Sequence, residues 1–300
     1  MKRMIGHEKN RLKFQNIVQS GNIANAYLFV GKDGIGKKLA AVEFAKSILC
    51  EHPQSGVFCG ACESCLTFEN NSDFKMIVPT KDVIKVDTIR EFIAELFLKP
   101  TISYRKVFII DGADKMNEQA QNALLKALEE PPSYATIILI ATGKEKLLNT
   151  IKSRVVEFTF DRLTDDEIVQ ILKESEEDLS KELLDTAVTF ANGSAMKALE
   201  VIHDSHFEAQ KELAQSILQK DFLKMNQNLE FLKSDKSLKA DIPNILEKVI
   251  YIFYHELKKD MSFDYRLIDI LESTIENIKR NANLDLALDN MMIRVLETKG

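Results

Sequence analysis

The segment Ala26-Tyr-Leu-Phe-Val30 is followed at once by Gly31-Lys-Asp-Gly-Ile-Gly36-Lys37. The first segment is an apolar, β-rich run that predicts a buried strand, and residues 38–49 after the glycines predict a helix. The order strand, G-x-x-x-x-G-K, helix is typical of a phosphate-binding loop (P-loop). In such a loop backbone N–H groups and the helix N-terminus converge on phosphate, and the lysine reaches the outer phosphates. The candidate phosphate-binding residues are therefore Gly31, Gly34, Gly36 and Lys37.

Further β-rich runs alternate with helical segments through the first half of the chain. The runs span residues 74–78, 106–110, 136–140 and 155–160, and helices are expected over 86–98 and 117–130. Several runs lack polar alternation, as expected for strands buried on both faces of a parallel sheet. The alternation predicts right-handed crossovers with helices on both faces of that sheet.

The second half is nearly free of residues that break helices. Nine of the 11 glycines and five of the 6 prolines lie at or before residue 143, so an all-helical second half is expected. Thr164 with Glu167 three residues later predicts a capped helix start. We therefore expect three domains: an α/β domain over 1–160, a small helical domain over 161–207, and longer amphipathic helices over 208–300.

Composition and charge exclude several classes of protein. Hydrophobic residues make up 45% and charged residues 29% of the 300 residues, an ordinary globular composition. The apolar runs are too short to cross a bilayer, and the N-terminal residues do not resemble a secretory signal, so no membrane association and a cytoplasmic location are expected. The net charge is −6, and no segment is strongly basic, which argues against a protein that binds DNA by itself.

The residues expected to hold Mg²⁺ depart from a working P-loop. Lys38 stands where Ser or Thr would ligate the ion, and a lysine repels a cation. The apolar run ends in Asp111, as a Walker B strand does, but Gly112 follows where many ATPases have a glutamate. We therefore expect no hydrolysis here and no Mg²⁺, with binding of ATP or ADP left open. The opposing interpretation is that Asp114 or another acid substitutes.

All four cysteines of the chain lie within sixteen residues, at Cys50, Cys59, Cys62 and Cys65. Two C-x2-C steps suit tetrahedral thiolate ligation of Zn²⁺, and four thiolates leave no open position, so a structural zinc knuckle over 50–65 is expected. A redox pair would need only two cysteines, while an iron–sulfur cluster remains chemically possible. The knuckle contains no Lys or Arg, which argues against a zinc module that contacts nucleic acid.

Taken together, these motifs resemble the bacterial clamp-loader ATPase family, a branch of the AAA+ proteins. The resemblance rests on the P-loop, the four cysteines, the Walker B-like strand, the run Asn122-Ala-Leu-Leu-Lys-Ala-Leu-Glu-Glu-Pro-Pro132 and Ser153-Arg154, in that order. It covers about residues 5–200 by motif. It implies an AAA+ domain, a small helical lid domain and a C-terminal helical collar that joins subunits.

The resemblance also implies roles for single residues. The arginine of the family's Ser-Arg-Cys motif enters the ATP site of the neighbouring subunit, which assigns Arg154, preceded by Ser153, as a finger acting in trans. The structural alternative is an arginine that caps a helix or pairs with an acid. Thr142 matches the sensor-1 position, and Met196 stands where the motor subunit has an arginine, although Lys197 could partly replace it.

Within the family, these losses resemble a non-motor subunit more than the motor subunit gamma/tau. The implied partners are gamma/tau and delta subunits, with the sliding clamp and primer–template DNA reached through the assembly. Two alternatives remain: a catalytically active, gamma/tau-like ATPase and a zinc-dependent DNA-binding module.

Overall fold

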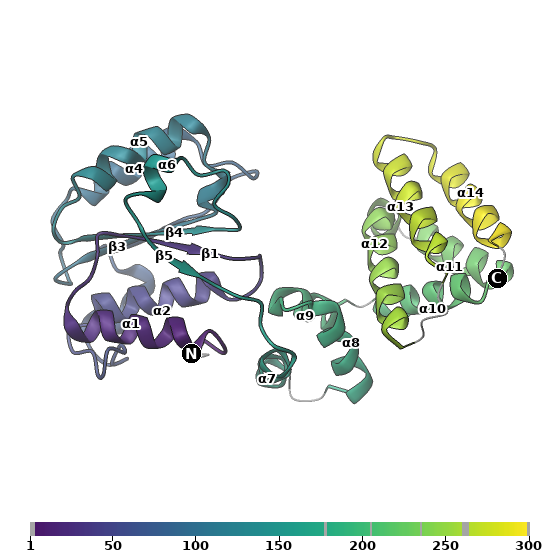
Figure 1. The fold of residues 1–300 in the computed structure, drawn as a ribbon, viewed down its shortest axis with the longest axis horizontal. Helices are drawn as coiled ribbons and strands as arrows, with labels where there is room; N and C mark the ends of the chain where they lie inside the picture. The colour runs from purple at the N-terminus through teal and green to yellow at the C-terminus, as the bar shows by residue number, and fades with distance from the viewer. Residues whose placement is uncertain (1–3, 177–178, 205, 235, 260–263, 299–300) are drawn as a thin grey trace. The chain divides into compact units, whose positions relative to one another are not determined.

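The computed structural model describes residues 4–176, 179–204, 206–234, 236–259 and 264–298. The chain forms two compact units (Figure 1). The first comprises residues 1–179 and 191–196, and the second comprises residues 180–190 and 197–300. The division into three domains expected from the sequence remains a prediction.

A five-stranded, fully parallel sheet forms the centre of the first unit, in the order β2-β3-β4-β1-β5. The strands are β1 Ala26–Val30, β2 Phe74–Ile77, β3 Lys106–Asp111, β4 Ala135–Ala141 and β5 Val156–Thr159. All five coincide with the predicted runs to within a residue or two at each end. Every residue of β4 is buried, as its unbroken apolar sequence predicts.

Helices cover both faces of this sheet (Figure 1). One face carries α1 Glu8–Ser20 and α2 Lys37–Leu49, and the other carries α4 Val86–Leu96, α5 Glu118–Glu129 and α6 Asn149–Lys152. On the first face Phe14 of α1 stacks on Phe29 and Phe44, with ring centroids 5.1 and 4.5 Å apart. The predicted α/β architecture is thus confirmed. The helix α1 was not expected from the sequence, because its residues are polar on average.

Short elements connect the strands. They are α3 Glu63–Leu66 with the 3-10 turn η1 Phe68–Asn70 before β2, and the 3-10 turn η2 Ala113–Lys115 after β3. The buried Asp73 holds the loop before β3, because its carboxylate accepts hydrogen bonds from the N–H groups of Thr101, Ile102 and Ser103. This loop is irregular but tightly fixed by charge-assisted bonds.

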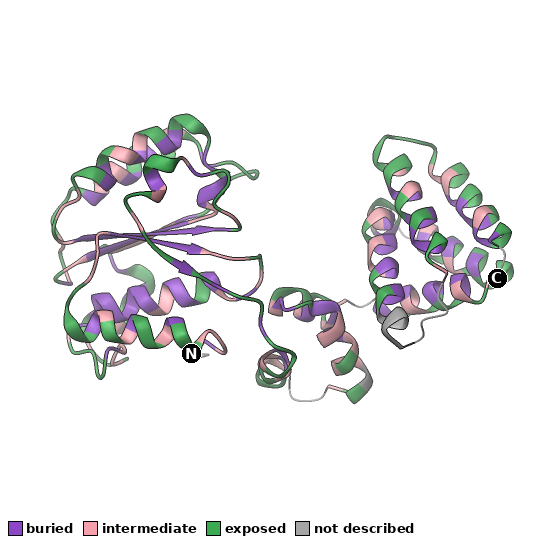
Figure 2. Ribbon diagram, in the orientation of Figure 1, coloured by how far each residue is buried: buried purple, intermediate pink, exposed green. Residues whose placement is uncertain are grey.

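After the sheet the described residues are helical, as predicted. The helices are α7 Asp165–Ser175, α8 Lys181–Ala191, α9 Ala195–Ile202, α10 Phe207–Leu218, α11 Phe222–Ser234, α12 Lys236–Lys259, α13 Arg266–Lys279 and α14 Leu284–Glu297. The predicted start of α7 is confirmed: Thr164 accepts from the N–H of Glu167, and Glu167 accepts from the N–H of Thr164. Each helix of the C-terminal group buries one stripe of side chains and exposes the opposite stripe (Figure 2).

Within the described residues, no helix combines the length and the apolar character needed to cross a membrane.

Candidate nucleotide site, arginine finger and metal centre

The predicted P-loop lies at the carboxyl edge of the sheet. Because β3, β4 and β1 are neighbouring parallel strands, the residues at or just after their carboxyl ends are brought together. These residues line a hollow of about 650 Å³, which contains Gly34, Gly36, Lys37, Asp111 and Thr142 among its walls. The structure therefore places these five predicted site residues in one location. Gly31 lies at the base of the same loop.

The loop glycines adopt the conformation that a phosphate cradle requires. Gly34 and Gly36 have φ values of 74° and 99°, in the left-handed region that favours glycine. A Cβ on Gly34 would lie 2.2 Å from Oγ of Ser194 and 2.6 Å from Cβ of Met196. The N–H of Met196 donates to the carbonyl of Gly34 at 3.2 Å. Met196, expected where the motor subunit has an arginine, therefore lies against the P-loop.

Lys37 is almost completely buried, with 6% of its side chain exposed. Its ammonium donates to the carbonyl oxygens of Gly31 and Lys32, so in this state it closes the loop on itself. Burial lowers the pKa of Lys37, and the nearby carboxylates of Asp33 and Asp111 counteract part of that effect. Bound phosphate oxygens could take the place of the two carbonyls as acceptors.

Lys38 approaches the residue that would otherwise hold a metal ion. Its Nζ lies 3.3 Å from Oδ2 of Asp111, and the two side chains are 55% and 26% exposed. An ammonium group therefore occupies the neighbourhood of the Walker B-like carboxylate, and Mg²⁺ does not fit the residues present here. Both the missing hydroxyl ligand and the added positive charge oppose a cation.

Thr142 is engaged within the protein. Its hydroxyl donates to Oδ2 of Asp114 at 2.5 Å, while Oδ1 of Asp114 is buried and has no hydrogen-bond partner among the described residues. Asp114 thus lines the hollow together with Gly112 and Thr142, and neither of these two residues supplies a carboxylate that could act as a base. Met196 carries no charge, so it cannot replace the arginine that the motor subunit has at this position.

Arg154 lies two residues after the end of the short helix α6. Its Nη2 lies 2.9 Å from Oε1 of Glu129, the last residue of α5, and its Nη1 donates to the carbonyl of Thr150 at 2.9 Å and to Oγ of Ser153 at 3.2 Å. The side chain remains 35% exposed. Within this chain Arg154 therefore pairs with an acid, as expected for the alternative to a trans finger. Its side chain is still partly exposed to solvent.

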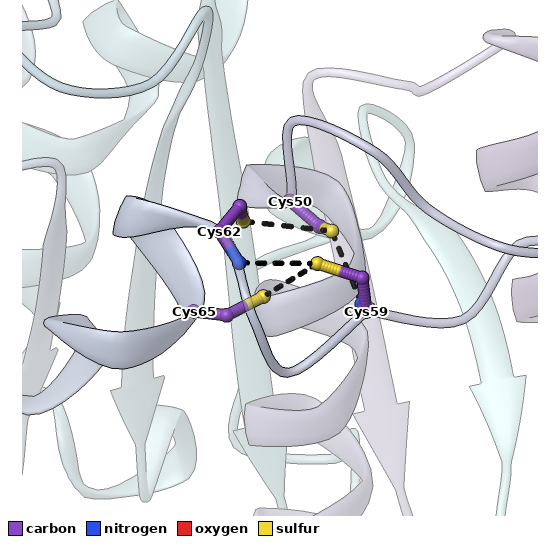
Figure 3. A group of neighbouring side chains, drawn as sticks. All are labelled: Cys50, Cys59, Cys62 and Cys65. Carbon is purple, nitrogen blue, oxygen red and sulfur yellow. Dashed lines mark hydrogen bonds between the residues drawn. The ribbon is translucent and has the colours of Figure 1, made fainter.

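The four cysteines converge as the spacing predicts (Figure 3). All four Sγ atoms lie within 4.8 Å of one another, with 3.9 Å between Cys50 and Cys62 and 4.0 Å between Cys59 and Cys65. Disulfide sulfurs would be about 2 Å apart. Tetrahedral Zn²⁺ with bonds of about 2.3 Å separates its sulfurs by about 3.8 Å, so this donor set fits a metal ion held by four thiolates.

Backbone amides donate directly to two of the cysteine sulfurs, those of Cys50 and Cys59. Sγ of Cys59 accepts from the N–H groups of Ala61 and Cys62, at 3.4 and 3.3 Å, and these bonds lower the pKa of Cys59 to about 6. Burial raises the pKa of Cys50 and of Cys65. A divalent cation would offset that cost, because a coordinating thiol is deprotonated.

The cysteine module is tied to the sheet domain by a buried polar contact. Oγ of Ser64, in α3, lies 2.9 Å from Oγ of Ser103, in the loop held by Asp73. Asn71 donates to the same Ser64 oxygen at 3.3 Å. A metal ion at the cysteines would therefore order a segment that continues into the core.

Sequence reasoning missed three partners that the fold supplies. They are Asp111 as partner of Lys38, Asp114 as partner of Thr142, and Glu129 as partner of Arg154. Glu129 stood within the quoted Glu-Glu-Pro-Pro run, but its spacing of 25 residues from Arg154 carries no local signal. Only the adjacency of α5 and α6 brings them together.

A parallel sheet with a P-loop at its carboxyl edge, a cysteine module after α2 and a helical second half define a P-loop protein of the AAA+ type. The family model described as DNA polymerase III, delta subunit matches residues 6–164. The chain belongs to this family of bacterial clamp-loader proteins.

The relatives of this chain include gamma and delta' subunits of DNA polymerase III. The chain is 33% identical over 211 residues to the DNA polymerase III subunit gamma of Buchnera aphidicola, covering 68% of this chain and 58% of that protein. It is 37% identical over 138 residues to subunit delta' of Pseudomonas aeruginosa, covering 45% and 42%. The chain thus spans less than two thirds of the length of these relatives.

The fold has a solved counterpart. A DNA polymerase III gamma subunit-related protein of Thermotoga maritima superposes with a TM-score of 0.52 at 20% identity, over 95% of this chain and 98% of that one. At this identity the match supports the fold and no residue role.

Proposed function

We propose that this chain is a delta-prime-type subunit of the DNA polymerase III clamp loader. It hydrolyses no ATP at its own P-loop and supplies Arg154 to the ATP site of an adjacent gamma/tau subunit. The observation that carries the proposal is the ion pair of Lys38 with Asp111, at 3.3 Å, in the position where a motor subunit needs a metal ion. Because an ammonium group fills that position, we expect this chain to contribute to ATP hydrolysis only through a residue that reaches a neighbouring subunit, namely Arg154.

The accessibility of Arg154 supports the second half of the proposal. Its guanidinium is anchored at Thr150 and Ser153 by its Nη1 atom, and its contact with Glu129 is partly exposed to solvent. An arginine delivered in trans stabilises charge that develops on a transferred phosphoryl group and typically accelerates the reaction by about 10³–10⁵.

The C-terminal helices would provide the assembly contacts. Leu223 and Phe231 on α11, and Leu286 and Ile293 on α14, are large apolar side chains that are more than half exposed. We assign residues 208–300 to a collar that packs against gamma/tau and delta subunits, through which the chain would serve the sliding clamp and primed DNA. Leu286→Glu should weaken co-purification with gamma/tau, whereas unchanged assembly would contradict the collar.

The test of the finger uses a loader reconstituted from this chain, gamma/tau and delta, with clamp and primed DNA. Arg154→Ala should lower DNA-stimulated ATP hydrolysis, and Arg154→Lys should not restore it, because an ammonium lacks the planar fork. Lys152→Ala, two residues away, is the matched control. Full hydrolysis and clamp loading with Arg154→Ala would reject the proposal.

A gamma/tau-like ATPase remains the second candidate, because the gamma subunit is among the relatives above 30% identity. Turnover of ATP by the chain alone that Lys37→Ala abolishes would favour it.

A further inference from the structure

The hollow at the P-loop retains its phosphate-binding parts although its metal ligand is gone. The loop glycines keep the left-handed backbone, α2 presents its N-terminus, and the buried Lys37 lies within the loop. What replaces the Ser or Thr hydroxyl is a second ammonium, that of Lys38, paired with Asp111. The loss is therefore an exchange of one cation for another at almost the same place.

We propose that this hollow binds a nucleoside di- or triphosphate without a divalent cation, with the Lys38 ammonium standing in for Mg²⁺ between Asp111 and the phosphates. In a metal-dependent site the ion bridges the phosphate oxygens and a carboxylate. An ammonium has three donors, so one can remain on Asp111 while others reach phosphate oxygens. The proposal concerns this chain alone and does not rest on its role in a loader.

The hollow has the size and lining for a nucleotide. Its volume of about 650 Å³ lies within the usual range for small-ligand sites, about 300–1,000 Å³. Leu39, Val42 and Met196 add apolar walls next to the polar loop. Such a lining suits a ribose and base adjoining a phosphate chain better than it suits an isolated inorganic anion.

A second observation points to an occupant. Asp114 is 9% exposed and lines the hollow, and its Oδ1 has no hydrogen-bond partner among the described residues. A buried acceptor left unpaired is costly, so a donor on an occupant that reached this carboxylate would stabilise it. Thr142 holds the other oxygen of this carboxylate and so fixes its direction.

Charge balance predicts how this site differs from a metal-dependent one. The walls carry three lysines (37, 38 and 115) and three aspartates (33, 111 and 114). Because an ammonium has one charge where Mg²⁺ has two, the bound phosphates are less fully neutralised. Hydrogen bonds from Lys37, Lys38 and the loop backbone then contribute more to the affinity than the net charge of the site does. Added Mg²⁺ should therefore not tighten binding.

The test is isothermal titration of the full-length chain with ATP and with ADP, once in EDTA and once in Mg²⁺. For the wild type we expect the same dissociation constant in both, within about twofold. Lys38→Thr restores a hydroxyl ligand next to Asp111, so it should bind about tenfold more weakly in EDTA and recover in Mg²⁺. Lys9→Thr, at an exposed position of α1 outside the hollow's walls, is the matched control and should behave as wild type.

Three results would overturn the inference: no binding of either nucleotide by the wild type up to about 1 mM, wild-type binding that requires Mg²⁺, or Lys38→Thr binding in EDTA as tightly as wild type. Inorganic tripolyphosphate that binds as tightly as ATP would refute the nucleoside part. Circular dichroism melts establish that each variant is folded. None of these variants changes Arg154. A negative result in this titration would therefore leave the trans-finger proposal intact, and a negative result for the finger would leave the nucleotide-binding proposal intact.

Discussion

Removal of the Glu129 carboxylate should increase the availability of Arg154 to a neighbouring subunit. The guanidinium lies 2.9 Å from that carboxylate, and both side chains are substantially exposed, at 35% and 49%. A pair of this kind contributes about 0.2–1 kcal/mol, which corresponds to a factor of about 1.4 to 5 in an equilibrium. Glu129→Gln should therefore raise the rate of ATP hydrolysis at the site served by Arg154 by at most about fivefold.

Other contacts limit the effect to this range. Nη1 of Arg154 still donates to Thr150 and Ser153, so the side chain keeps its general position after the substitution. Glu129 is also the last residue of α5, where a negative charge is unfavourable, so its loss should not destabilise the helix. The variant thus changes the competition for Arg154 and leaves the fold intact.

The assay is single-turnover ATP hydrolysis by the reconstituted loader, with Glu130→Gln as the control that removes a neighbouring exposed charge. The increase should disappear when Glu129→Gln is combined with Arg154→Ala, because the effect acts through the guanidinium. A decrease of tenfold or more for Glu129→Gln would refute the reasoning, since it would mean that the carboxylate positions the finger.

Three further expectations concern stability. Cys62→Ser should remove bound zinc, measured as metal per chain by mass spectrometry, and lower the melting temperature; an unchanged melt would contradict a structural metal. Lys248→Met should cost about 1–3 kcal/mol in urea unfolding at pH 7, because it leaves the mostly buried Asp204 without its ammonium partner. Although burial opposes it, hydrogen bonding lowers the pKa of Asp204 below 3.8. That contribution is present above pH 3.8 and is lost as the pH falls through the lowered folded-state pKa, so the difference between variant and wild type should shrink as the pH falls below 3.8. Asp73→Asn should cost a similar amount, about 1–3 kcal/mol, since an amide cannot accept from all three loop N–H groups; a urea midpoint equal to wild type would refute this.

The strands were predictable because each is a local, unbroken apolar run between turn residues. β4 is entirely buried, and its limits differ from those expected by one residue at each end. The start of α7 was predictable for the same reason, since a capping box lies within four residues. The helix α1 was missed because it buries only Asn10, Phe14 and Val18, a narrow stripe in a polar sequence.

The candidate metal centre was predictable from the three spacings between the four cysteines, because short loops can bring nearby cysteines to one point with few alternatives. The P-loop was equally local. The loss of ATP hydrolysis and Mg²⁺ binding was predicted from two missing groups, a hydroxyl at position 38 and a carboxylate at position 112. The sequence alone did not show that Lys38 pairs with Asp111.

The sequence by itself therefore determined the positions of the strands along the chain, the clustering of the cysteines and the defect in the P-loop, since each depends on residues close together in the chain. Tertiary structure decided the pairings across long separations: Lys38 with Asp111, Thr142 with Asp114, and Arg154 with Glu129. Parallel strands place residues far apart in sequence at one edge of the sheet, and the choice of partner there depends on strand order and side-chain reach. For that reason the pairing of Lys38 with Asp111 is visible only in the folded chain.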